Sequence, residues 1–489
     1  MVNGNEEESL KQKTAKGLFW GGFSNITQLL IGVGFSIFIA RILNQKDYGF
    51  LGVLNVFIGI GSQLTISGFS NALINIKKIT QKDYNAVFWF SSLMGIGLYI
   101  LLYFCAPLIA AFFKYQELVA LSRVLFITIP LGGISVVSST ILIKKVMVRE
   151  MATIDITAQI ISSIVGLTLA LKGFEYWALA IQNILLLSLS FILRIFQAKW
   201  LPDFSFDFSP LKKMLPFSIK LLITGIFTTV NNNMMPVILG RYFNINDVGN
   251  YNQGYKWAWM GSSFMDGMLG YITQPVLVQV NEEKERMVAV FRKLIRFSAF
   301  LSIPLLWGLA FIGNEFILIT IGEKWLPAVP FLQLFCIWGS VKFLWTLYTN
   351  LMYSHGKSNI YMYITIAIGV LQLFTILALY SFGIITMTAG YIIVYFGGLL
   401  VWQYFAQKLI GLTYKNVFRD IFPYFGVTLV CFSIAWLVTK NIENVYWSMS
   451  LKIIVSVILY ISLLKILKSK IFEESVAFLK IKRQEINKK

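Results

Sequence analysis

The sequence predicts an all-α protein that crosses a membrane about fourteen times. Hydrophobic residues make up 57% of its 489 positions, charged residues make up only 13%, and the mean hydropathy is +0.70. A soluble chain of this length would be about one quarter charged. Apolar runs follow one another from Gly17 to Leu467. Each run is about 20 residues long, which is enough for a helix to cross roughly 30 Å of hydrocarbon.

The distribution of positive charge predicts the orientation of these spans. A net charge of +19 would suit nucleic acid, but 30 of the 42 Lys and Arg residues fall on one side of the predicted spans and only nine on the other. Such a bias marks the cytoplasmic side. We therefore expect two cytoplasmic termini and no nucleic-acid partner. Residues 3–9 are polar and acidic, so the first span, without a cleavable signal peptide before it, would itself direct insertion.

Each apolar run corresponds to one expected helix. The runs cover residues 17–40, 48–75, 86–113, 119–143, 152–172, 174–197, 215–240, 248–279, 293–320, 327–352, 359–381, 384–407, 418–439 and 446–467. The midpoint is rich in proline, charge and aromatic residues, which is typical of an interfacial linker. The expected organisation is an N-terminal lobe (1–198, spans one to six), a linker (199–213), a C-terminal lobe (214–408, spans seven to twelve), two extra spans (409–467) and a basic tail (468–489).

A turn sequence that recurs 200 residues later indicates that the two lobes are duplicated. Six residues are identical between positions 41–62 and 241–262, whereas chance gives roughly one or two. The pairs are Arg41 and Arg241, Asn44 and Asn244, Asp47 and Asp247, Gly49 and Gly249, Gly61 and Gly261, and Ser62 and Ser262. Duplicated halves are the usual construction of secondary transporters. A structural role is also open, because Asn44 suits the end of one helix and Asp47 the start of the next.

Polar side chains within the spans are the candidates for function, because charge at membrane depth is costly and usually faces a cavity. Lys256 and Asp266 lie in span eight, about 15 Å apart along one helix, so they should not pair directly. Several cations with few acids suit an anionic substrate. The candidate substrate-binding residues are Lys220, Lys256, Lys342, Arg41, Arg241, Asn231 and Gln253, and Asp266 is the candidate for ion coupling. The alternative is that these charges snorkel to the headgroups or are neutralised by neighbouring helices.

Sites for catalysis, metals or nucleotides have weak support in this sequence. Gly356-Lys357-Ser358 lacks the upstream glycine of a phosphate-binding loop. His355 is the single histidine, and Cys105, Cys336 and Cys431 lie in separate apolar runs without metal-ligand spacing. We therefore expect neither an enzyme nor a bound cofactor or metal.

Four stretches resemble the Wzx-like polysaccharide and lipopolysaccharide flippases. Residues 174–182 (FEYWALAIQ) resemble the family signature GYWALVxQ, and residues 231–257 resemble the segment that opens the second half of the family. Residues 322–328 (GEKWLPA) and Gly356-Lys357 are similar to two further family stretches. The resemblance extends from about residue 16 to residue 467. It implies membership of the multidrug/oligosaccharidyl-lipid/polysaccharide flippase superfamily, which also contains multidrug antiporters and lipid II flippases.

This resemblance implies both a fold and an activity. The fold would be fourteen transmembrane helices in two pseudo-symmetric six-helix lobes around a cavity, plus two C-terminal helices. The protein would be a functional monomer in the bacterial inner membrane. It would carry an undecaprenyl-pyrophosphate-linked oligosaccharide across the bilayer by alternating access for O-antigen, capsule or exopolysaccharide synthesis, with H⁺ or Na⁺ as the coupling ion where coupling exists. The alternatives are an ion-coupled drug or cation antiporter and a membrane glycan polymerase, although the predicted outer segments are short for catalysis.

Overall fold

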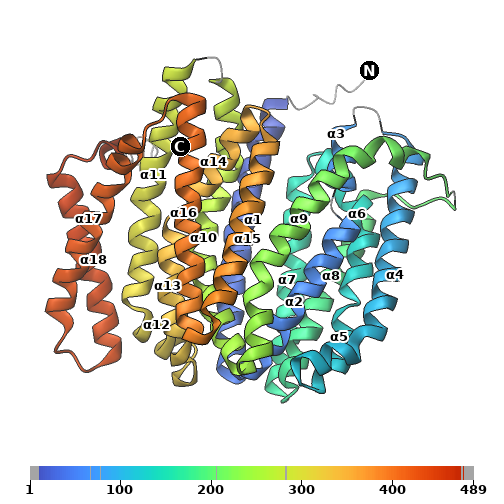
Figure 1. The fold of residues 1–489 in the computed structure, drawn as a ribbon, viewed down its shortest axis with the longest axis horizontal. Coiled ribbons are helices and arrows are strands. Elements are labelled where there is room, and N and C mark those ends of the chain that lie inside the picture. The colour runs from blue at the N-terminus through green and yellow to red at the C-terminus, as the bar shows by residue number, and fades with distance from the viewer. Residues whose placement is uncertain are drawn as a thin grey trace, which may run out of the picture. The chain divides into compact units, whose positions relative to one another are not determined.

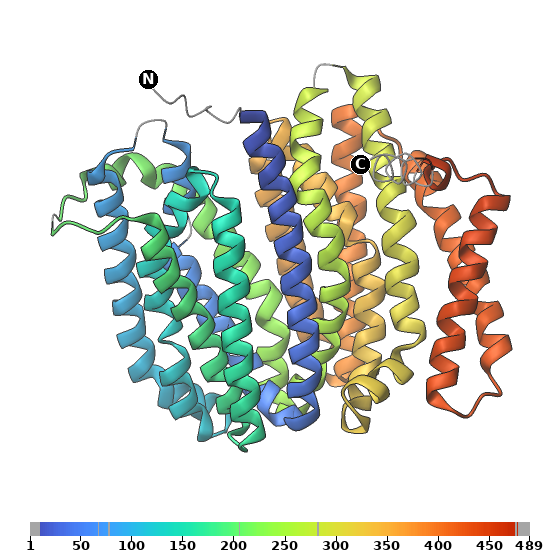
Figure 2. The same cartoon turned by 180° about the vertical axis from the view of Figure 1, so that it is seen from behind.

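The computed structural model describes residues 10–66, 68–76, 79–204, 206–280, 283–474 and 477. Throughout these residues the regular structure is helical, which confirms the predicted all-α class (Figure 1). Packing between helices divides the chain into two compact units, Met1–Asn252 and Gln253–Lys489. The view from behind shows the long helices of each unit running side by side (Figure 2).

The first unit contains the helices α1 to α9 and the first turns of α10. Its elements are α1 (Leu10–Ile42), α2 (Gln45–Ile66), α3 (Phe69–Asn75), α4 (Gln81–Phe113), α5 (Glu117–Leu125), α6 (Thr128–Lys144), α7 (Val148–Leu171), α8 (Glu175–Ala198), α9 (Ser209–Tyr242) and α10 (Ile245–Gln279). Helix α1 packs on α7, α4 packs on α6, and α9 packs on α2. Helix α9 was expected in the C-terminal lobe (214–408), whereas its packing joins it to the first unit.

The second unit continues from α10. Its elements are α11 (Lys284–Phe311), α12 (Gly313–Thr320), the 3₁₀ turn η1 (Glu323–Ala328), α13 (Val329–Ser340), α14 (Lys342–Ser354), α15 (Ser358–Leu379), η2 (Tyr380–Phe382), α16 (Ile384–Ile410), α17 (Tyr414–Thr439) and α18 (Val445–Ile466). Helix α11 contacts α13 and α17, α15 contacts α16, and α17 pairs with α18. The last two helices form a hairpin against α11 and α12, coloured red in Figure 1.

Helices occupy all fourteen predicted spans, but several are broken. Spans two, four, nine and ten are interrupted at Gly68, at Phe126-Ile127, at Ile312 and at Val341, respectively. By length and apolar composition, the described residues contain 12 candidate spans, or 13 if the two parts of α9, bent by 63°, count as one. Helix α10 is not among them, and its 35 residues include six amide side chains and three charged ones. The sequence predicts fourteen spans, whereas length and apolar composition identify 12 or 13 among the described residues.

Side-chain caps define several helix starts. Thr80 and Asp83 form a reciprocal capping box at α4, in which each side chain accepts a backbone N–H from the other residue. Asn444 Oδ1 accepts the backbone N–H groups of Tyr446 and Trp447 at the start of α18. Such caps satisfy the backbone donors that the first helical turn leaves unpaired.

The linker between α8 and α9 is held against α4. Helix α9 begins at Ser209, so the irregular part of the predicted linker ends at residue 208. Trp200 Nε1 donates to Gln81 Oε1 at 2.8 Å, and Trp89 Nε1 donates to the Asp203 carbonyl at 2.9 Å. The Trp89 ring also lies 4.7 Å from the ring of Phe206. Aromatic contacts of this kind, with their polar groups satisfied, suit the membrane interface.

The two repeated turns have the same local structure. The backbone N–H of Asn44 donates to Asp47 Oδ2 at 2.8 Å, and the backbone N–H of Asn244 donates to Asp247 Oδ2 at 3.2 Å. Each aspartate thereby caps the helix that follows the turn, and its charge is favourable at a helix N-terminus. Asp47 thus acts at the start of α2 as expected, but as its third residue rather than at the N-cap position.

The repeated turns also pack directly against each other. A Cβ atom on Gly49 would lie 2.1 Å from the Ile245 carbonyl oxygen, and one on Gly249 would lie 2.0 Å from the Gln45 carbonyl oxygen. Residues 49 and 249 are equivalent in the two repeats, and so are residues 45 and 245. The two contacts are therefore related by the pseudo-two-fold symmetry of the repeats. The turns therefore lie on the same side of the first unit, and glycine is needed where their backbones meet.

The start of the C-terminal tail lies against the second unit. Lys293 on α11 forms a 2.6 Å ion pair with Glu474, and its ammonium group lowers the pKa of the Glu474 carboxyl. Ile471 is buried. Of the predicted basic tail (468–489), residues 475, 476 and 478–489 lie outside the described residues.

Candidate functional site

An ion pair within the second unit joins two of the predicted functional residues. The Nζ atom of Lys342 lies 2.6 Å from Oδ2 of Asp266, and the Oγ1 of Thr346 donates to Oδ1 of Asp266 at 3.0 Å. Both carboxylate oxygens are therefore occupied by donors. The side chains of Lys342 and Asp266 are 22% and 25% exposed, so the pair is largely removed from solvent but still accessible. Charge-assisted contacts of this kind are stronger than neutral hydrogen bonds.

A helix break positions the ammonium group. Lys342 was expected within one continuous span (327–352), but α13 ends at Ser340 and Lys342 is the first residue of α14. A cation at a helix N-terminus opposes the helix dipole, whereas a carboxylate there is favourable. The negative charge of Asp266 therefore balances both the positive charge of Lys342 and the positive end of the α14 helix dipole. Thr346 lies one turn further along α14, on the same face as Lys342.

Aromatic side chains surround this pair, and the sequence analysis did not identify them. The Nζ atom of Lys342 lies 5.3 Å from the centroid of the Trp338 ring. That ring lies 5.9 Å from Tyr255 and 5.7 Å from Tyr395, and Trp345 stacks on Tyr395 at 5.0 Å. We call Tyr255, Trp338, Trp345 and Tyr395 the aromatic shell. The signal in the sequence was the tryptophans four residues before and three residues after Lys342. Such a shell lowers the local dielectric and adds cation–π attraction.

Gln253 and Lys256 lie together one turn apart on α10. Gln253 is 1% exposed, and within the part of the chain that the structure describes neither its Oε1 nor its Nε2 has a hydrogen-bond partner. Lys256 is partly buried three residues further along the helix. Buried amides are nearly always hydrogen-bonded in folded proteins, so Gln253 calls for an explanation. A ligand hydroxyl group would provide the missing partner.

The remaining predicted residues belong to the first unit. Arg241 Nη1 donates to the Phe112 carbonyl at 2.6 Å, and its guanidinium lies 5.0 Å from the Phe112 ring, so Arg241 is engaged at the end of α4. Arg41 is exposed in the last turn of α1, and Asn231 is partly buried on α9. The side chain of Lys220 lies outside the described residues.

Metal-ligating side chains are dispersed in the part of the chain that the structure describes. Among the described residues, no three His, Cys, Asp or Glu side chains come together as a metal site. Cys105, Cys336 and Cys431 are free thiols.

Comparison with known proteins identifies the family of the chain. The sequence model of the family described as "Polysaccharide biosynthesis protein" matches residues 38–330, which run from the end of α1 into α13 and include both repeated turns and Asp266. The chain belongs to this family. The prediction of a Wzx-like relationship is confirmed.

Two relatives and one solved structure are similar to this chain over most of its length. The teichuronic acid biosynthesis protein TuaB of Bacillus subtilis (strain 168) is 25% identical over 393 residues, which cover 80% of this chain and 81% of TuaB. The lipopolysaccharide biosynthesis protein WzxC of Escherichia coli (strain K12) is 24% identical over 343 residues, 68% of each chain. The lipid II flippase MurJ, in an inward closed conformation, matches with a TM-score of 0.72 and 15% identity over 95% of this chain and 99% of MurJ. This last similarity establishes the fold of a multi-pass membrane protein.

Proposed function

We propose that this family member is a flippase that moves an undecaprenyl-pyrophosphate-linked oligosaccharide across the bacterial inner membrane for cell-surface polysaccharide synthesis. The observation that carries the proposal is the family match together with a flippase-like fold over 95% of the chain. The names of TuaB and WzxC, both biosynthesis proteins for surface polymers, support this substrate class. The activity is transport, which requires differential binding in two conformations and no covalent chemistry.

The ion pair suits a substrate with a pyrophosphate group. Phosphate oxygens can replace the Asp266 carboxylate at the ammonium of Lys342, because both are anionic acceptors of charge-assisted hydrogen bonds. Asp266 would then be left unpaired in a partly buried environment, where an isolated charge is costly. A proton or Na⁺ at Asp266 would remove that cost. When phosphate takes the place of Asp266 at Lys342, Asp266 becomes a site for a cation. Phosphate binding and cation binding are thereby coupled through the pair Asp266–Lys342.

The other candidates are proposed as further contacts to the same substrate. Lys256 and Lys220, with Arg41 and Arg241 at the helix ends, would provide further positive charge for the pyrophosphate. The amides of Asn231 and Gln253 would bind sugar hydroxyl groups, and the unsatisfied amide of Gln253 supports this assignment. The polyprenyl tail can remain in the hydrocarbon of the bilayer while the polar group follows this path.

The proposal is tested by expressing the chain in a strain that lacks its own flippase but keeps a known pathway for surface polysaccharide. We expect wild-type protein to restore glycan export to the cell surface. A drug antiporter would instead raise resistance to cationic compounds and leave export unrestored. A polymerase would lengthen glycans that already reach the outer surface. Either of these results, without restored export, would reject the flippase assignment.

Replacing Asp266 with Asn tests the coupling role. The amide keeps the shape of the side chain but cannot bind a proton or Na⁺ as a carboxylate does. We expect Asp266→Asn to remove the dependence of export on the ion gradient while substrate binding is largely retained, because Lys342 keeps its charge. Export is measured with and without an ionophore. Gradient dependence equal to that of the wild type would remove Asp266 from this role.

Both termini are expected on the cytoplasmic side because of the asymmetry in Lys and Arg residues. Reporter fusions after Lys213 and Lys489 test this orientation. Each fusion should be active only with a cytoplasmic reporter. An extracytoplasmic signal at either position would contradict this topology.

A further inference from the structure

One face of α14 is polar from the Asp266–Lys342 pair to the end of the helix. At 3.6 residues per turn, the buried residues of α14 all fall on one half of the helix. They are Phe343, Leu344, Leu347, Tyr348, Leu351 and Met352. The other half is partly or fully exposed, and we call its polar residues the polar strip: Lys342, Thr346, Thr349, Asn350 and Tyr353. The strip is about 16 Å long. It ends beside Lys357, on the side that the charge asymmetry predicts to be cytoplasmic.

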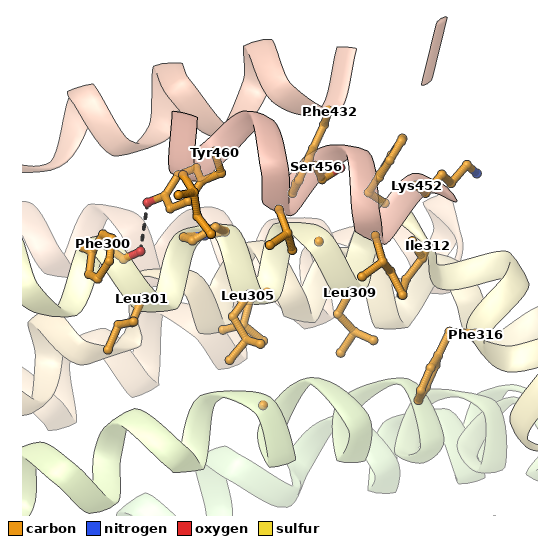
Figure 3. A pocket seen from close by; sticks show the side chains of 18 residues that line it. Phe300, Leu301, Leu305, Leu309, Ile312, Phe316, Phe432, Lys452, Ser456 and Tyr460 are labelled. Atoms are coloured by element: carbon orange, nitrogen blue, oxygen red, sulfur yellow. Dashed lines mark hydrogen bonds between the residues drawn. The ribbon is translucent and has the colours of Figure 1, made fainter. Parts of the chain in front are cut away.

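Two hydroxyl groups at this strip call for water. The Oγ1 atoms of Thr349 on α14 and Thr365 on α15 are buried, and neither has a hydrogen-bond partner within the described part of the chain. Buried hydroxyl groups normally find an acceptor. Tyr460 shows the usual case, since its Oη donates to the Phe300 carbonyl at 2.9 Å, as the dashed line in Figure 3 marks. Ordered water is the common partner of buried polar groups that the protein itself leaves unpaired.

These two threonines follow a pair of tyrosines at the end of the strip. The rings of Tyr353 on α14 and Tyr361 on α15 lie 5.2 Å apart, and Tyr353 is 39% exposed. Thr349 is four residues before Tyr353, and Thr365 is four residues after Tyr361. Each threonine therefore lies one turn further from the α14–α15 loop, on the same side of its helix as the tyrosine. Water at the two hydroxyl groups would thus lie behind the tyrosine pair, whose outer edge is accessible.

The other end of the strip reaches the carboxylate. Thr346 lies one turn from Thr349, and its Oγ1 donates to Oδ1 of Asp266 at 3.0 Å. A hydroxyl group can accept one hydrogen bond while it donates another. Thr346 can therefore receive a proton from a water molecule at Thr349 and release its own proton to Asp266.

The surroundings of Asp266 favour a proton over a metal cation. The titratable groups that interact with its carboxylate are Lys342, Tyr255 and Tyr395. Lysine and tyrosine side chains already hold their protons at neutral pH, so Asp266 is the proton acceptor of this group. The Lys342 ammonium, 2.6 Å from Oδ2, would repel Na⁺ but would not repel a neutral carboxylic acid.

We propose that water bound at Thr349 and Thr365 conducts protons from the cytoplasmic end of α14 through Thr346 to Asp266, and that H⁺ is the coupling ion. The inference rests on the proposed function, in which pyrophosphate takes the place of Asp266 at Lys342. In each transfer one proton moves from water to Thr346 Oγ1, and the Thr346 hydroxyl gives one proton to Oδ1. The hydroxyl group is thereby restored, and the carboxylate becomes neutral.

Proton uptake by the purified full-length protein tests this proposal. Undecaprenyl pyrophosphate is mixed with the protein in weakly buffered detergent solution that contains a pH-indicator dye, and uptake is followed by stopped flow. Binding is followed in parallel by tryptophan fluorescence. We expect one proton to be taken up for each molecule bound. Asp266→Asn should still bind undecaprenyl pyrophosphate but take up no proton, because its amide does not titrate.

The path is tested by removing the two hydroxyl groups. Thr349→Val with Thr365→Val should take up the same number of protons about tenfold more slowly, the rate change that corresponds to the loss of one hydrogen bond. The binding signal should keep its rate. Thr349→Ser with Thr365→Ser keeps both hydroxyl groups and should restore fast uptake. Thr386→Val is the matched control, because Thr386 is exposed on α16 and its Oγ1 donates to the Phe382 carbonyl at 3.1 Å. Fast proton uptake by the double valine variant would overturn the path.

The same measurements separate this inference from the proposed function. Binding of undecaprenyl pyrophosphate that requires Na⁺ and takes up no proton would leave the flippase proposal standing and overturn the proton path. Absence of binding by the folded wild-type protein would instead reject the proposed function, and the proton path with it.

Discussion

Lys342→Ala should abolish glycan export and lower the stability of the second unit. The substitution removes the ammonium that binds phosphate in the proposed mechanism and leaves the Asp266 carboxylate without its ion-pair partner. Removing one partner of a fully buried ion pair costs about 3–5 kcal/mol. The cost should be smaller here, because both side chains are about one quarter exposed. Lys342→Arg keeps the charge but changes its geometry, so it should retain part of the export, whereas Lys342→Glu should lose it.

The double variant Lys342→Ala with Asp266→Asn separates transport from folding. It removes both charges, so we expect its melting temperature to return towards that of the wild type while export remains absent. Export in the complemented strain and thermal unfolding of the purified protein are the two measurements. Lys172→Ala, a change at an exposed lysine after α7, is the control and should leave both values unchanged. Normal export by both Lys256→Ala and Lys342→Ala would show that the cationic path is not used.

Gly49→Ala and Gly249→Ala should each destabilise the first unit where the two repeated turns meet. The added Cβ would lie 2.1 Å or 2.0 Å from a carbonyl oxygen of the other repeat, and because that atom belongs to the backbone, the helices must move apart. Overpacking of this kind costs about 1–3 kcal/mol and sometimes more. We expect a lower melting temperature and, if the turns must stay in contact during transport, reduced export.

Gly97→Ala provides the matched control for these two variants. Gly97 lies within α4, and nothing lies within 4 Å of the position that its Cβ would occupy. Alanine is more favourable than glycine inside a helix by about 0.5–1 kcal/mol, so this change should raise the melting temperature slightly. If all three variants unfold at the wild-type temperature, the close backbone contact between the turns does not exist in the folded protein.

Local features of the fold could be predicted because they depend on residues that are close in sequence. Apolar runs of sufficient length specify membrane-spanning helices, since only internally hydrogen-bonded elements are stable in hydrocarbon. The recurrence of Asn44 and Asp47 as Asn244 and Asp247 likewise predicted two equivalent helix starts. Breaks within the spans were harder to predict. The break at Val341 has neither proline nor glycine at that position, and it decides that Lys342 begins a helix rather than lying within one.

The sequence by itself determined the helical membrane class, the family, the duplicated turns and the set of polar residues at membrane depth, because each of these depends on composition or on spacing along the chain. Only the tertiary structure decided which of those polar residues meet. Lys256 and Asp266 share a helix and lie too far apart along it, whereas Lys342 reaches Asp266 from another helix. Charge alone indicates that Asp266 pairs with a lysine, but it does not decide which of Lys220, Lys256 and Lys342 is the partner. The choice depends on how α14 packs near α10, and that packing arises from contacts between apolar faces distant in sequence, including the aromatic shell around the pair.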